Sequence, residues 1–477
     1  MKRGRDNQRG VALIIVLFLS AVLTLMMYAF LREMQVEYSL ASSLAAEKQA
    51  EQLAYGAIDK AFAGIAAEGV APATLTSPWY NNPEEFYEME VTDPDGLVVG
   101  VYTTIRANAA GETAPLFGIM DEASKVNINT APREQLMKLP RMTDEIADSI
   151  IDWRDTDETP TGTGGENAYY LSLQPGYACK NGFFDTVEEL LLVKGVTPEI
   201  LYGEDLNQNG VLDPSEDDGD KTPPNDNGDG VLDVGLIAVA TVVSYDKNVR
   251  ADGTARININ TATNQQLQQA LGDVLNGQQI NNIPLRRQAI ATATNGPGFR
   301  SGADLMDFPG IPLGGINAQQ YRQIADRVTA VDAEDVPGLI NINTATKRVL
   351  ETIADWTAED VAAVMEYRTT PGSDLSNIGW VTNVLPVPKM QSAGPFLTVR
   401  SWQYRIDAIG RAGPKSELAA TDLGSTSSRR AGPVPPPRVM KRFAAIYDKA
   451  ATPARLVYFK EVSKLGLPYP VQEPREP

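Results

Sequence analysis

The stretch that decides the fold is residues 11–31, VALIIVLFLSAVLTLMMYAFL, which holds 21 residues without a charge. About 20 apolar residues cross a bilayer as one helix, so this stretch is long enough to span a membrane. Beyond it, apolar residues recur at helical spacing as far as Ile65, with charged residues between them. We therefore predict one helix over residues 11–66, with its first half in lipid and its second half packed on a soluble domain.

A basic leader precedes this helix. Residues 2–9 hold four basic residues and one acid, and Gly10 is the last residue of the leader. Positive charge before a membrane span keeps that end in the cytoplasm, so the rest of the chain is expected on the far side. The alternative, a cleaved signal peptide, has a shorter apolar core of about 7–15 residues.

A leader ending in Gly10, followed by a helix that is half apolar and half amphipathic, resembles the class III leader of type IV pilins and type II secretion pseudopilins. The resemblance implies that a prepilin peptidase cuts between Gly10 and Val11 and methylates the new N-terminus. Losing residues 1–10 removes four basic residues and one acid, which changes the formal charge from −19 to −22.

Most members of that family carry Glu at the fifth mature position, where this chain has Ile15. There the carboxylate meets the charged N-terminus of a neighbouring subunit, and without a partner it would be costly in lipid. The minor pseudopilins of the general secretion pathway protein K (GspK) family lack this Glu and are placed at the filament tip. The resemblance to that family implies a subunit with no neighbour on one side.

The composition excludes several classes of function. The 477 residues include no His and a single Cys, Cys179, so Ser-His-Asp and Cys-His catalysis, His-ligated zinc and an internal disulfide are excluded. Apolar residues make up 43% of the chain, which is enough for packed cores. The acidic balance argues against a protein that mainly binds phosphate backbones. We expect no enzyme activity.

A six-residue phrase, φNφNTA with φ apolar, occurs three times and each copy precedes a helical stretch; the copies are residues 126–131, 257–262 and 340–345. In the first copy, Thr130 and Pro132 stand in the order expected at a helix start, and a second helix is predicted over residues 144–153. In the third copy, Thr344 is expected to cap a helix. The middle copy is looser.

These units resemble the helix-hairpin-helix modules of DNA-binding proteins such as the competence receptor ComEA, and also the all-helical insert of the GspK family. A DNA-binding hairpin uses Gly-φ-Gly, whose bare N–H groups and following helix N-terminus hold a phosphate. None of the four hairpins here has both glycines, and Asp355 stands where a phosphate would sit; the hairpins are residues 139–143, 193–197, 308–312 and 353–357. The pattern favours a packing scaffold over DNA binding.

An acidic stretch after the first copy fits a calcium loop of the EF-hand type. Oxygen ligands recur at positions 1, 3, 5, 9 and 12, position 6 is Gly210, and position 7 offers its carbonyl. The candidate ligands are Asp205, Asn207, Asn209, Val211, Asp213 and Glu216. Seven oxygens at this spacing suit Ca²⁺ better than Mg²⁺. Without a clear helix on both sides the loop predicts a structural calcium site, and the alternative is a solvated acidic turn.

A second, weaker copy of the loop spans residues 225–236. Its candidate ligands are Asn225, Asn227, Asp229 and Asp233, but Leu236 takes the place of the closing carboxylate. A solvated acidic turn is an equal alternative for this loop.

A further acidic segment lies upstream of both loops. The order WRDTD (153–157), GGEN (164–167), YY (169–170) and EELLLVKGV (188–196) closely resembles the GspK family. Acidic residues of this segment hold calcium in that family, so the resemblance implies Asp155, Asp157 and Glu166 as ligands. The alternative is a helix end and a surface loop with ordinary solvated acids.

Short strands are predicted on both sides of the helical region, at residues 85–91, 96–107, 115–121, 396–411, 438–448 and 455–460. We therefore predict an α+β fold of the type IV pilin kind, a long N-terminal helix packed on an antiparallel sheet, with a large inserted α-helical domain. The expected parts are a leader (1–10), the helix (11–66), the first part of the sheet (67–120), the insert with its calcium loops (121–390), the second part of the sheet (391–470) and a loose tail (471–477). Residues 412–437 are predicted to form a flexible loop.

The resemblance implies a minor pseudopilin of the type II secretion system at the pseudopilus tip. The partners it implies are GspI, GspJ, GspH and the major GspG, together with prepilin peptidase and inner-membrane lipid. It places the N-terminus in the cytoplasm and the bulk in the periplasm. A membrane-anchored competence-type DNA-binding protein and a minor pilin of a type IV pilus are the alternatives.

Overall fold

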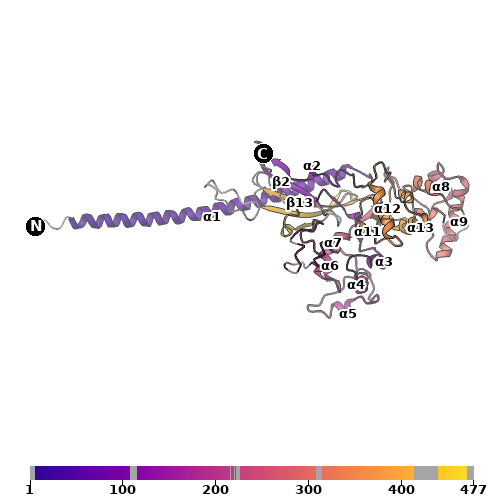
Figure 1. Ribbon diagram of the computed structural model, residues 1–477, viewed down its shortest axis with the longest axis horizontal. Coiled ribbons are helices and arrows are strands. Elements are labelled where there is room, and N and C mark those ends of the chain that lie inside the picture. The colour runs from indigo at the N-terminus through magenta and orange to yellow at the C-terminus, as the bar shows by residue number, and fades with distance from the viewer. Residues whose placement is uncertain are drawn as a thin grey trace.

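The computed structural model describes residues 6–107, 115–214, 216–219, 221, 226–307, 314–412 and 439–469. Its longest element is α1 (Asp6–Ala67), a single helix of 62 residues whose first half projects alone from the body of the molecule (Figure 1). None of its most apolar window is buried in the molecule, so by length and composition α1 could cross a membrane. The predicted continuous helix is confirmed. It starts at Asp6, inside the predicted leader, so Gly10 and Val11 both lie within the helix.

The second half of α1 packs on an antiparallel sheet in the order β1-β2-β13-β14-β15, with β3 beside β2 and β4 beside β13. A buried apolar row on α1, which includes Ala54, Ile58 and Ile65, meets Tyr404 and Phe443 of the sheet. The strands are β1 (Met89–Thr92), β2 (Val98–Arg106), β3 (Leu116–Phe117), β4 (Met120–Asp121), β13 (Gln403–Ala412), β14 (Met440–Asp448) and β15 (Arg455–Glu461).

The insert leaves this sheet after β4 and returns before β13, so one sheet is built from both ends of the chain. Gly410 on β13 allows the close contact with the helix, because a Cβ there would lie 2.0 Å from the carbonyl oxygen of Ala50. This is the predicted pilin-like α+β fold.

The sheet regions differ from the sequence prediction in three places. Residues 83–86 form a short helix, α2 (Pro83–Phe86), and the strand expected from residue 85 begins only at Met89. Pro83 at its first turn and the two acids after it favour a helix start. The strand expected over residues 396–411 is interrupted between β12 (Leu397–Thr398) and β13.

The third difference lies at the C-terminal end. Beyond Val462, within the predicted second part of the sheet, the described chain forms the 3-10 helix η6 (Ser463–Leu465) and no strand. It ends at a buried Tyr469, whose hydroxyl lies 2.9 Å from Thr103 Oγ1. The tail predicted at residues 471–477 and nearly all of the loop predicted at 412–437 lie outside the described residues.

The insert consists of three modules, each closed by a parallel bridge between the start of the repeated phrase and an apolar-Thr pair downstream. We call residues 126–241 module 1, residues 257–329 module 2 and residues 340–398 module 3. The bridges join β5 (Val126–Asn127) to β6 (Ala240–Thr241), β8 (Ile257–Asn258) to β9 (Val328–Thr329), and β11 (Ile340–Asn341) to β12. One buried apolar cluster runs through all three modules.

Short helices fill each module between its bridge strands. The helices of modules 2 and 3 lie beyond the sheet, away from the free half of α1, and those of module 1 lie beside the sheet (Figure 1). Module 1, with a 3-10 turn before it, holds η1 (Glu122–Ser124), α3 (Arg133–Leu136), α4 (Asp144–Arg154), α5 (Asn167–Tyr170), η2 (Val187–Leu192), α6 (Pro198–Tyr202) and α7 (Leu236–Val239). Module 2 holds α8 (Asn264–Leu271), α9 (Gly277–Thr294), η3 (Gly302–Leu305) and α10 (Ala318–Ile324). Module 3 holds α11 (Lys347–Leu350), α12 (Ala358–Thr369), η4 (Ile378–Asn383), α13 (Val387–Ala393) and η5 (Gly394–Phe396). Between modules, β7 (Tyr245–Lys247) pairs with β10 (Asp335–Pro337).

Each two-residue parallel bridge leaves nearby backbone groups without a partner. Polar side chains, including those of the repeated phrase, form hydrogen bonds with these groups. In every module the first Asn accepts the N–H of the second at 2.8–3.1 Å. The second helix of each module carries an arginine, Arg154, Arg287 or Arg368, which donates to carbonyls of the phrase. Buried carbonyl groups need hydrogen-bond donors of this kind. The repeated phrase therefore has a structural explanation in each module.

The threonines of the phrase are not the helix caps that we predicted. Helix α3 begins after Pro132 with no side-chain cap, and Thr346, not Thr344, caps α11 by accepting the N–H of Val349. Thr344 is buried and donates to Asp121 Oδ2 at 2.6 Å. The end of the phrase closes a turn, which moves each helix start two residues downstream.

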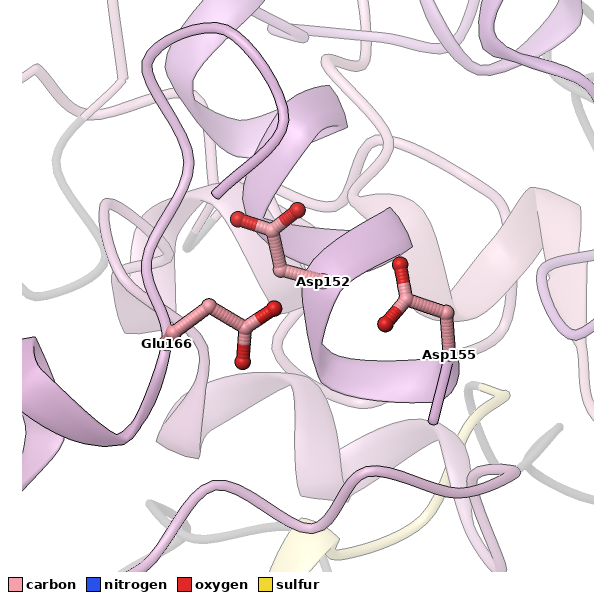
Figure 2. Close-up of side chains that lie close together, drawn as sticks. All are labelled: Asp152, Asp155 and Glu166. Carbon is pink, nitrogen blue, oxygen red and sulfur yellow. The ribbon is translucent and has the colours of Figure 1, made fainter. Parts of the chain in front are cut away.

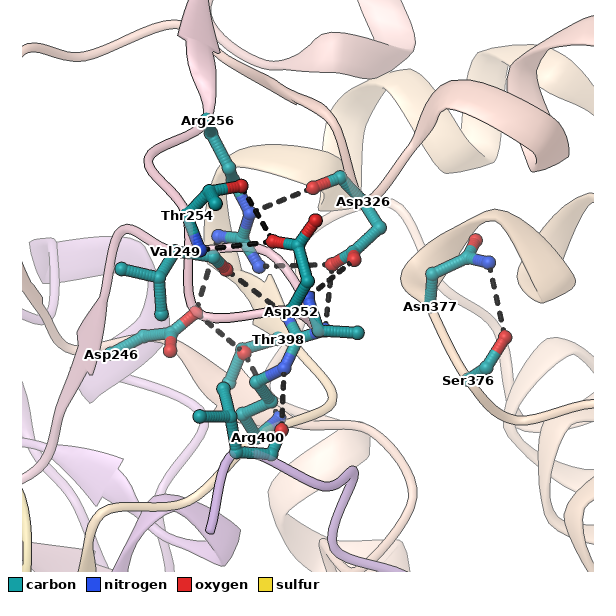
Figure 3. Close-up of polar contacts among 12 residues, drawn as sticks. Asp246, Val249, Asp252, Thr254, Arg256, Asp326, Ser376, Asn377, Thr398 and Arg400 are labelled. Atoms are coloured by element: carbon teal, nitrogen blue, oxygen red, sulfur yellow. Dashed lines mark hydrogen bonds and ion pairs between the residues drawn. The ribbon is translucent and has the colours of Figure 1, made fainter.

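A buried ionic joint connects the modules to the pilin domain (Figure 3). Arg400 lies 2.7 Å from Asp326 of module 2 and donates to the carbonyl of Val70, just after α1. Arg256 lies 3.4 Å from Asp246. The joint therefore connects both ends of module 2 to the chain after module 3 and to the chain just after α1.

Candidate metal sites

Three carboxylates of module 1 converge on one point. Asp152 lies in the last turn of α4, Asp155 is the residue that ends this helix, and Glu166 comes from the loop before α5. One oxygen of each lies within 4.8 Å of the others. Figure 2 shows the Glu166 carboxylate facing the end of α4 from the opposite loop.

Asp152 and Glu166 are buried, Asp155 is half-buried, and their charges are poorly compensated. Oδ2 of Asp152 and both oxygens of Glu166 are buried without a hydrogen-bond partner, and Glu166 is 2% exposed. Burial, together with the neighbouring charges of Asp152 and Asp155, raises the pKa of Glu166 to about 7. Burial also raises the pKa of Asp155. Buried like charges repel, so a cation at this point would satisfy what the protein leaves unpaired.

The loop that carries Glu166 is shaped to approach Asp152. The N–H of Thr161 donates to Asp152 Oδ1 at 2.8 Å. Gly164 permits the close approach, because a Cβ there would lie 2.1 Å from Asp152 Oδ2. By contrast, the neighbouring Asp148 is paired with Arg133 at 2.7 Å and needs no cation. The residues present fit a hard cation such as Ca²⁺, which takes carboxylate oxygens.

Of the three ligands implied by resemblance, the structure brings Asp155 and Glu166 together but not Asp157. Asp157 is exposed, and its carboxylate accepts the N–H of Thr159 at 2.7 Å. The third acid is Asp152, which our sequence analysis missed. It precedes Asp155 by three residues on α4, so helical periodicity could have found it.

The predicted ligands of the first calcium loop lie close together. Asp205 is buried, and its two oxygens accept the N–H groups of Asn209 and Gly210 at 3.0 and 2.8 Å. Glu216 reaches back across the loop and accepts the N–H groups of Leu206 and Asp213. Asn207 and Asp213 are also in contact, 2.7 Å apart. The predicted acidic and amide side chains thus close one compact loop.

Burial raises the pKa of Asp205 to about 6 and that of Glu216 to about 7. Both carboxyls are therefore held in a site that favours protonation or a bound cation over a bare charge. The calcium interpretation stays a prediction with this support.

The first calcium loop is also a contact to the pilin domain. Arg442 of β14, fully buried, forms two bonds to Asp407 at 2.8 and 2.7 Å and donates to the carbonyl of Asn207 at 2.8 Å. Asn209 donates to the carbonyl of Pro468 at 2.8 Å. Ordering of this loop therefore acts directly on the docking of module 1 and on the C-terminal segment.

The second loop differs from the first. Asn225 lies outside the described residues, and Asn227 and Asp229 contact mainly the loop backbone. Asp233 lies 3.0 Å from the guanidinium of Arg141, and its N–H donates to the buried Glu204. The guanidinium of Arg141 therefore lies beside both Asp233 and Glu204. The described residues give no support for a second EF-hand-like ion, which stays a prediction.

The described hairpins lack the paired glycines of a phosphate-binding hairpin. Arg141, Gly195 and Asp355 hold the left-handed position of their hairpins, with φ of 55°, 83° and 63°. Arg141 is bonded to the carbonyl of Glu199 and to Asp233, which leaves it engaged within the molecule. The hairpin at residues 308–312 lies outside the described residues.

Comparison with known proteins finds similarity over part of the chain. A family model described as type II secretion system protein K matches residues 122–202, the part of the chain that holds the three carboxylates. Two curated relatives share that description. The protein of Klebsiella pneumoniae is 26% identical over 201 residues, and that of Aeromonas hydrophila is 25% identical over 211 residues. The chain is therefore similar to type II secretion system protein K over this part of its length.

The two matches cover 40% and 41% of this chain and only 59% and 61% of the relatives. A solved GspK-GspI-GspJ complex from enterotoxigenic Escherichia coli is also similar, with a TM-score of 0.37 and 11% identity over 91% of this chain and 99% of that one. A likeness at that level supports no conclusion about fold or partners.

Proposed function

We propose that this chain is a type II secretion system protein K, a minor pseudopilin that sits at the tip of the type II secretion pseudopilus and helps to start its assembly. The observation that carries the proposal is α1. Its apolar first half is exposed throughout, and its second half is the core helix of the pilin domain. A helix of this kind is suited to leave a membrane and bundle with equivalent helices in a filament.

The position at the tip is supported by the distribution of mass. All three modules lie away from the free half of α1, with modules 2 and 3 at the opposite end of the molecule (Figure 1). A head of this size obstructs a subunit stacked directly above it but is harmless at the end of a filament. Ile15, in place of the usual Glu, fits a subunit with no neighbour to satisfy on that side.

The proposal extends to partners and location. GspI and GspJ would bind next to this chain, with GspH and GspG following, and the contacts would run along the N-terminal helices. The chain would enter the inner membrane with its N-terminus in the cytoplasm and keep its head in the periplasm. The metal sites would act as structural fasteners of module 1, since their residues connect loops and supply no catalytic group.

Co-assembly tests this proposal. The chain from residue 32 onward is mixed with the periplasmic parts of GspI and GspJ from the same bacterium, with calcium, and its mass is measured by light scattering after gel filtration. A stable complex with one copy of each supports the proposal. Separate elution of all three proteins would contradict it, as would tight, salt-sensitive binding to duplex DNA in a gel-shift assay.

A further inference from the structure

Two neighbouring acids of η2 form hydrogen bonds to different parts of the molecule. Glu189 accepts the indole N–H of Trp153 at 2.9 Å. Glu188 accepts the hydroxyl of Tyr458 at 2.8 Å and forms an ion pair with Lys460 at 2.9 Å. Since Trp153 belongs to α4 and the other two partners belong to β15, η2 connects the helix that ends at the converging carboxylates to the pilin sheet.

A second contact joins the end of η2 to the loop of the metal site. Lys194, two residues after η2, donates to the carbonyls of Thr163 and Gly164 at 2.9 and 3.2 Å. These two residues belong to the loop that approaches Asp152 and carries Glu166. The loop and the end of η2 are therefore held together.

The three carboxylates give this loop a reason to move. We call Asp152, Asp155 and Glu166 the three-carboxylate site; both oxygens of Glu166 are buried without a hydrogen-bond partner. Repulsion among three carboxylates favours a loop displaced from α4. A cation that binds all three favours a loop held against α4. Cation binding is therefore expected to change the position of the loop.

The strand β15 is held by few contacts. Within the described chain it pairs with β14 alone, and the register of that pair is irregular at one place. Leu456, Val457 and Phe459 are 43%, 37% and 44% exposed. Because an edge strand with exposed side chains opens more easily than a packed one, the contacts from Glu188 matter for the stability of β15.

Module 1 and this side of the sheet are separated by a groove of about 730 Å³. Glu199 and Leu206 of module 1 line it, together with Tyr458 and Val462. Open space here takes the place of packed side chains, and the bridge from Glu188 to β15 lies beside it. Small polar contacts between two parts of a chain permit relative movement.

We propose that η2 transmits cation binding at the three-carboxylate site to β15. With a cation bound, the loop and η2 are held in place, and Glu188 secures β15 against opening. Without a cation, η2 shifts with the loop, the bridge from Glu188 weakens, and β15 opens more often. The inference rests on the cation site described above and is independent of the secretion role.

The first calcium loop offers a second route to the same part of the sheet. Its contacts reach Arg442 of β14 and the carbonyl of Pro468, whereas those of η2 reach β15. A calcium effect on β15 that this loop carried would be lost in Glu216→Ala and kept in Glu166→Gln. The proposal predicts the reverse, so the two routes can be separated.

The test measures hydrogen–deuterium exchange of residues 455–461 in the full chain in detergent micelles, with a calcium chelator or with excess calcium. We expect calcium to slow the exchange of the paired amides about tenfold, because a strand that opens less often exchanges more slowly. Glu216→Ala should keep this slowing, and Glu166→Gln should lose it.

Glu188→Ala tests the bridge itself. It should abolish the slowing at residues 455–461, whereas calcium should still slow exchange at residues 161–166, because the three-carboxylate site is intact. The matched control is Glu199→Ala, on an exposed acid of the same groove that forms no ion pair with β15 in the described chain. This control should respond to calcium as the unmodified chain does.

A second variant covers the case in which Glu188→Ala melts early. Tyr458→Phe combined with Lys460→Met removes the same two contacts from the side of the sheet. It should also lose the slowing at residues 455–461 and keep the slowing at residues 161–166.

Three results would overturn the proposal. The first is unchanged exchange at residues 455–461 when calcium is added. The second is loss of the slowing in Glu216→Ala, because the first calcium loop would then carry the effect. The third is full slowing in Glu188→Ala, or equal loss in Glu199→Ala, because the bridge would then have no specific role.

Discussion

Glu166 carries a buried charge that no donor of the described residues compensates. Both of its oxygens are buried and lack a donor, and two further acids face it. An uncompensated negative charge in this position destabilises the fold. With a cation bound, the same charge would stabilise the fold. The residue therefore allows the metal interpretation to be tested from both directions.

Replacing this acid by its amide should have opposite effects with and without metal. At pH 8 without calcium, Glu166→Gln removes a buried charge and should raise stability by about 1 kcal/mol, roughly 2–4 °C in Tm. With calcium, the same variant should lose most of the calcium-induced rise in Tm. The matched control is Asp157→Asn, on an exposed acid outside the group, which should change neither curve. Equal calcium responses in Glu166→Gln and the unmodified chain would contradict a metal ion here.

The raised pKa values make a second prediction at this scale. The pKa is about 7 for Glu166 and Glu216 and about 6 for Asp205, each above its ordinary value. A carboxyl with a raised pKa stabilises the metal-free fold at low pH, and this stability is lost as pH rises from about 4.5 through 7. Protons compete with calcium for the same oxygens.

Scanning calorimetry from pH 5 to 8.5 checks this prediction. The calcium-induced rise in Tm should be largest at pH 8 and should shrink steadily below pH 7, while the metal-free Tm should move in the opposite direction. A calcium effect that stays constant across this range would be incompatible with ligands of raised pKa.

Among the elements, the first calcium loop has the widest structural consequence, because it contacts Arg442 of the sheet and the carbonyl of Pro468. Glu216→Ala removes the carboxylate that closes this loop. We expect it to abolish part of the calcium-induced rise in Tm and to speed hydrogen exchange at residues 463–469, since the segment loses its ordered neighbour. Glu199→Ala, on the short helix before the loop, is the control and should do neither. Unchanged exchange at residues 463–469 in Glu216→Ala would show that the loop does not hold this segment.

The start of α1 is the element to test for processing. Gly10→Val should block leader cleavage, because the resemblance assigns the cut to the bond after this glycine. Intact mass spectrometry of the membrane fraction would find the full-length chain, whereas the control Gly4→Val should yield a chain that starts at Val11. Mature protein from Gly10→Val would refute the assignment of the leader.

The helix α1 and most strands could be predicted because their signals are local and periodic. A long apolar run followed by helical spacing is readable over a few turns, and the alternation of β2 or β14 is readable within one strand. The bridges that close the modules could not be predicted in this way. Each pairs the repeated phrase with an apolar-Thr pair many dozens of residues downstream, and two residues carry too little pattern to be matched.

The candidate metal site was partly predictable for the same reason. Asp155 and Glu166 were placed by resemblance, and the first loop by its ligand spacing. Asp152 was missed because its role depends on burial, and burial depends on a loop held close by Gly164. Glu204 was missed because Arg141, distant in the sequence, determines its surroundings.

For the whole molecule, the acidic charge separates into parts with different roles. Ten residues before Val11 are basic on balance, and their loss would leave −22 on the remainder. Some of that charge is concentrated at the two candidate calcium sites of module 1, and more is neutralised in the joint around Arg400. The chain forms one pilin domain with a three-module insert. The result is a helix that is long and apolar enough to cross a membrane and that carries a large head.

The central claim is that this head occupies the end of a filament. Pseudopili assembled in a strain that produces this chain with an epitope tag after residue 469 can be labelled with gold-conjugated antibody and imaged by electron microscopy. The proposal predicts gold at one end of each filament and fewer filaments when the chain is deleted. Gold spaced along the shaft, or filaments of unchanged number without the chain, would contradict it.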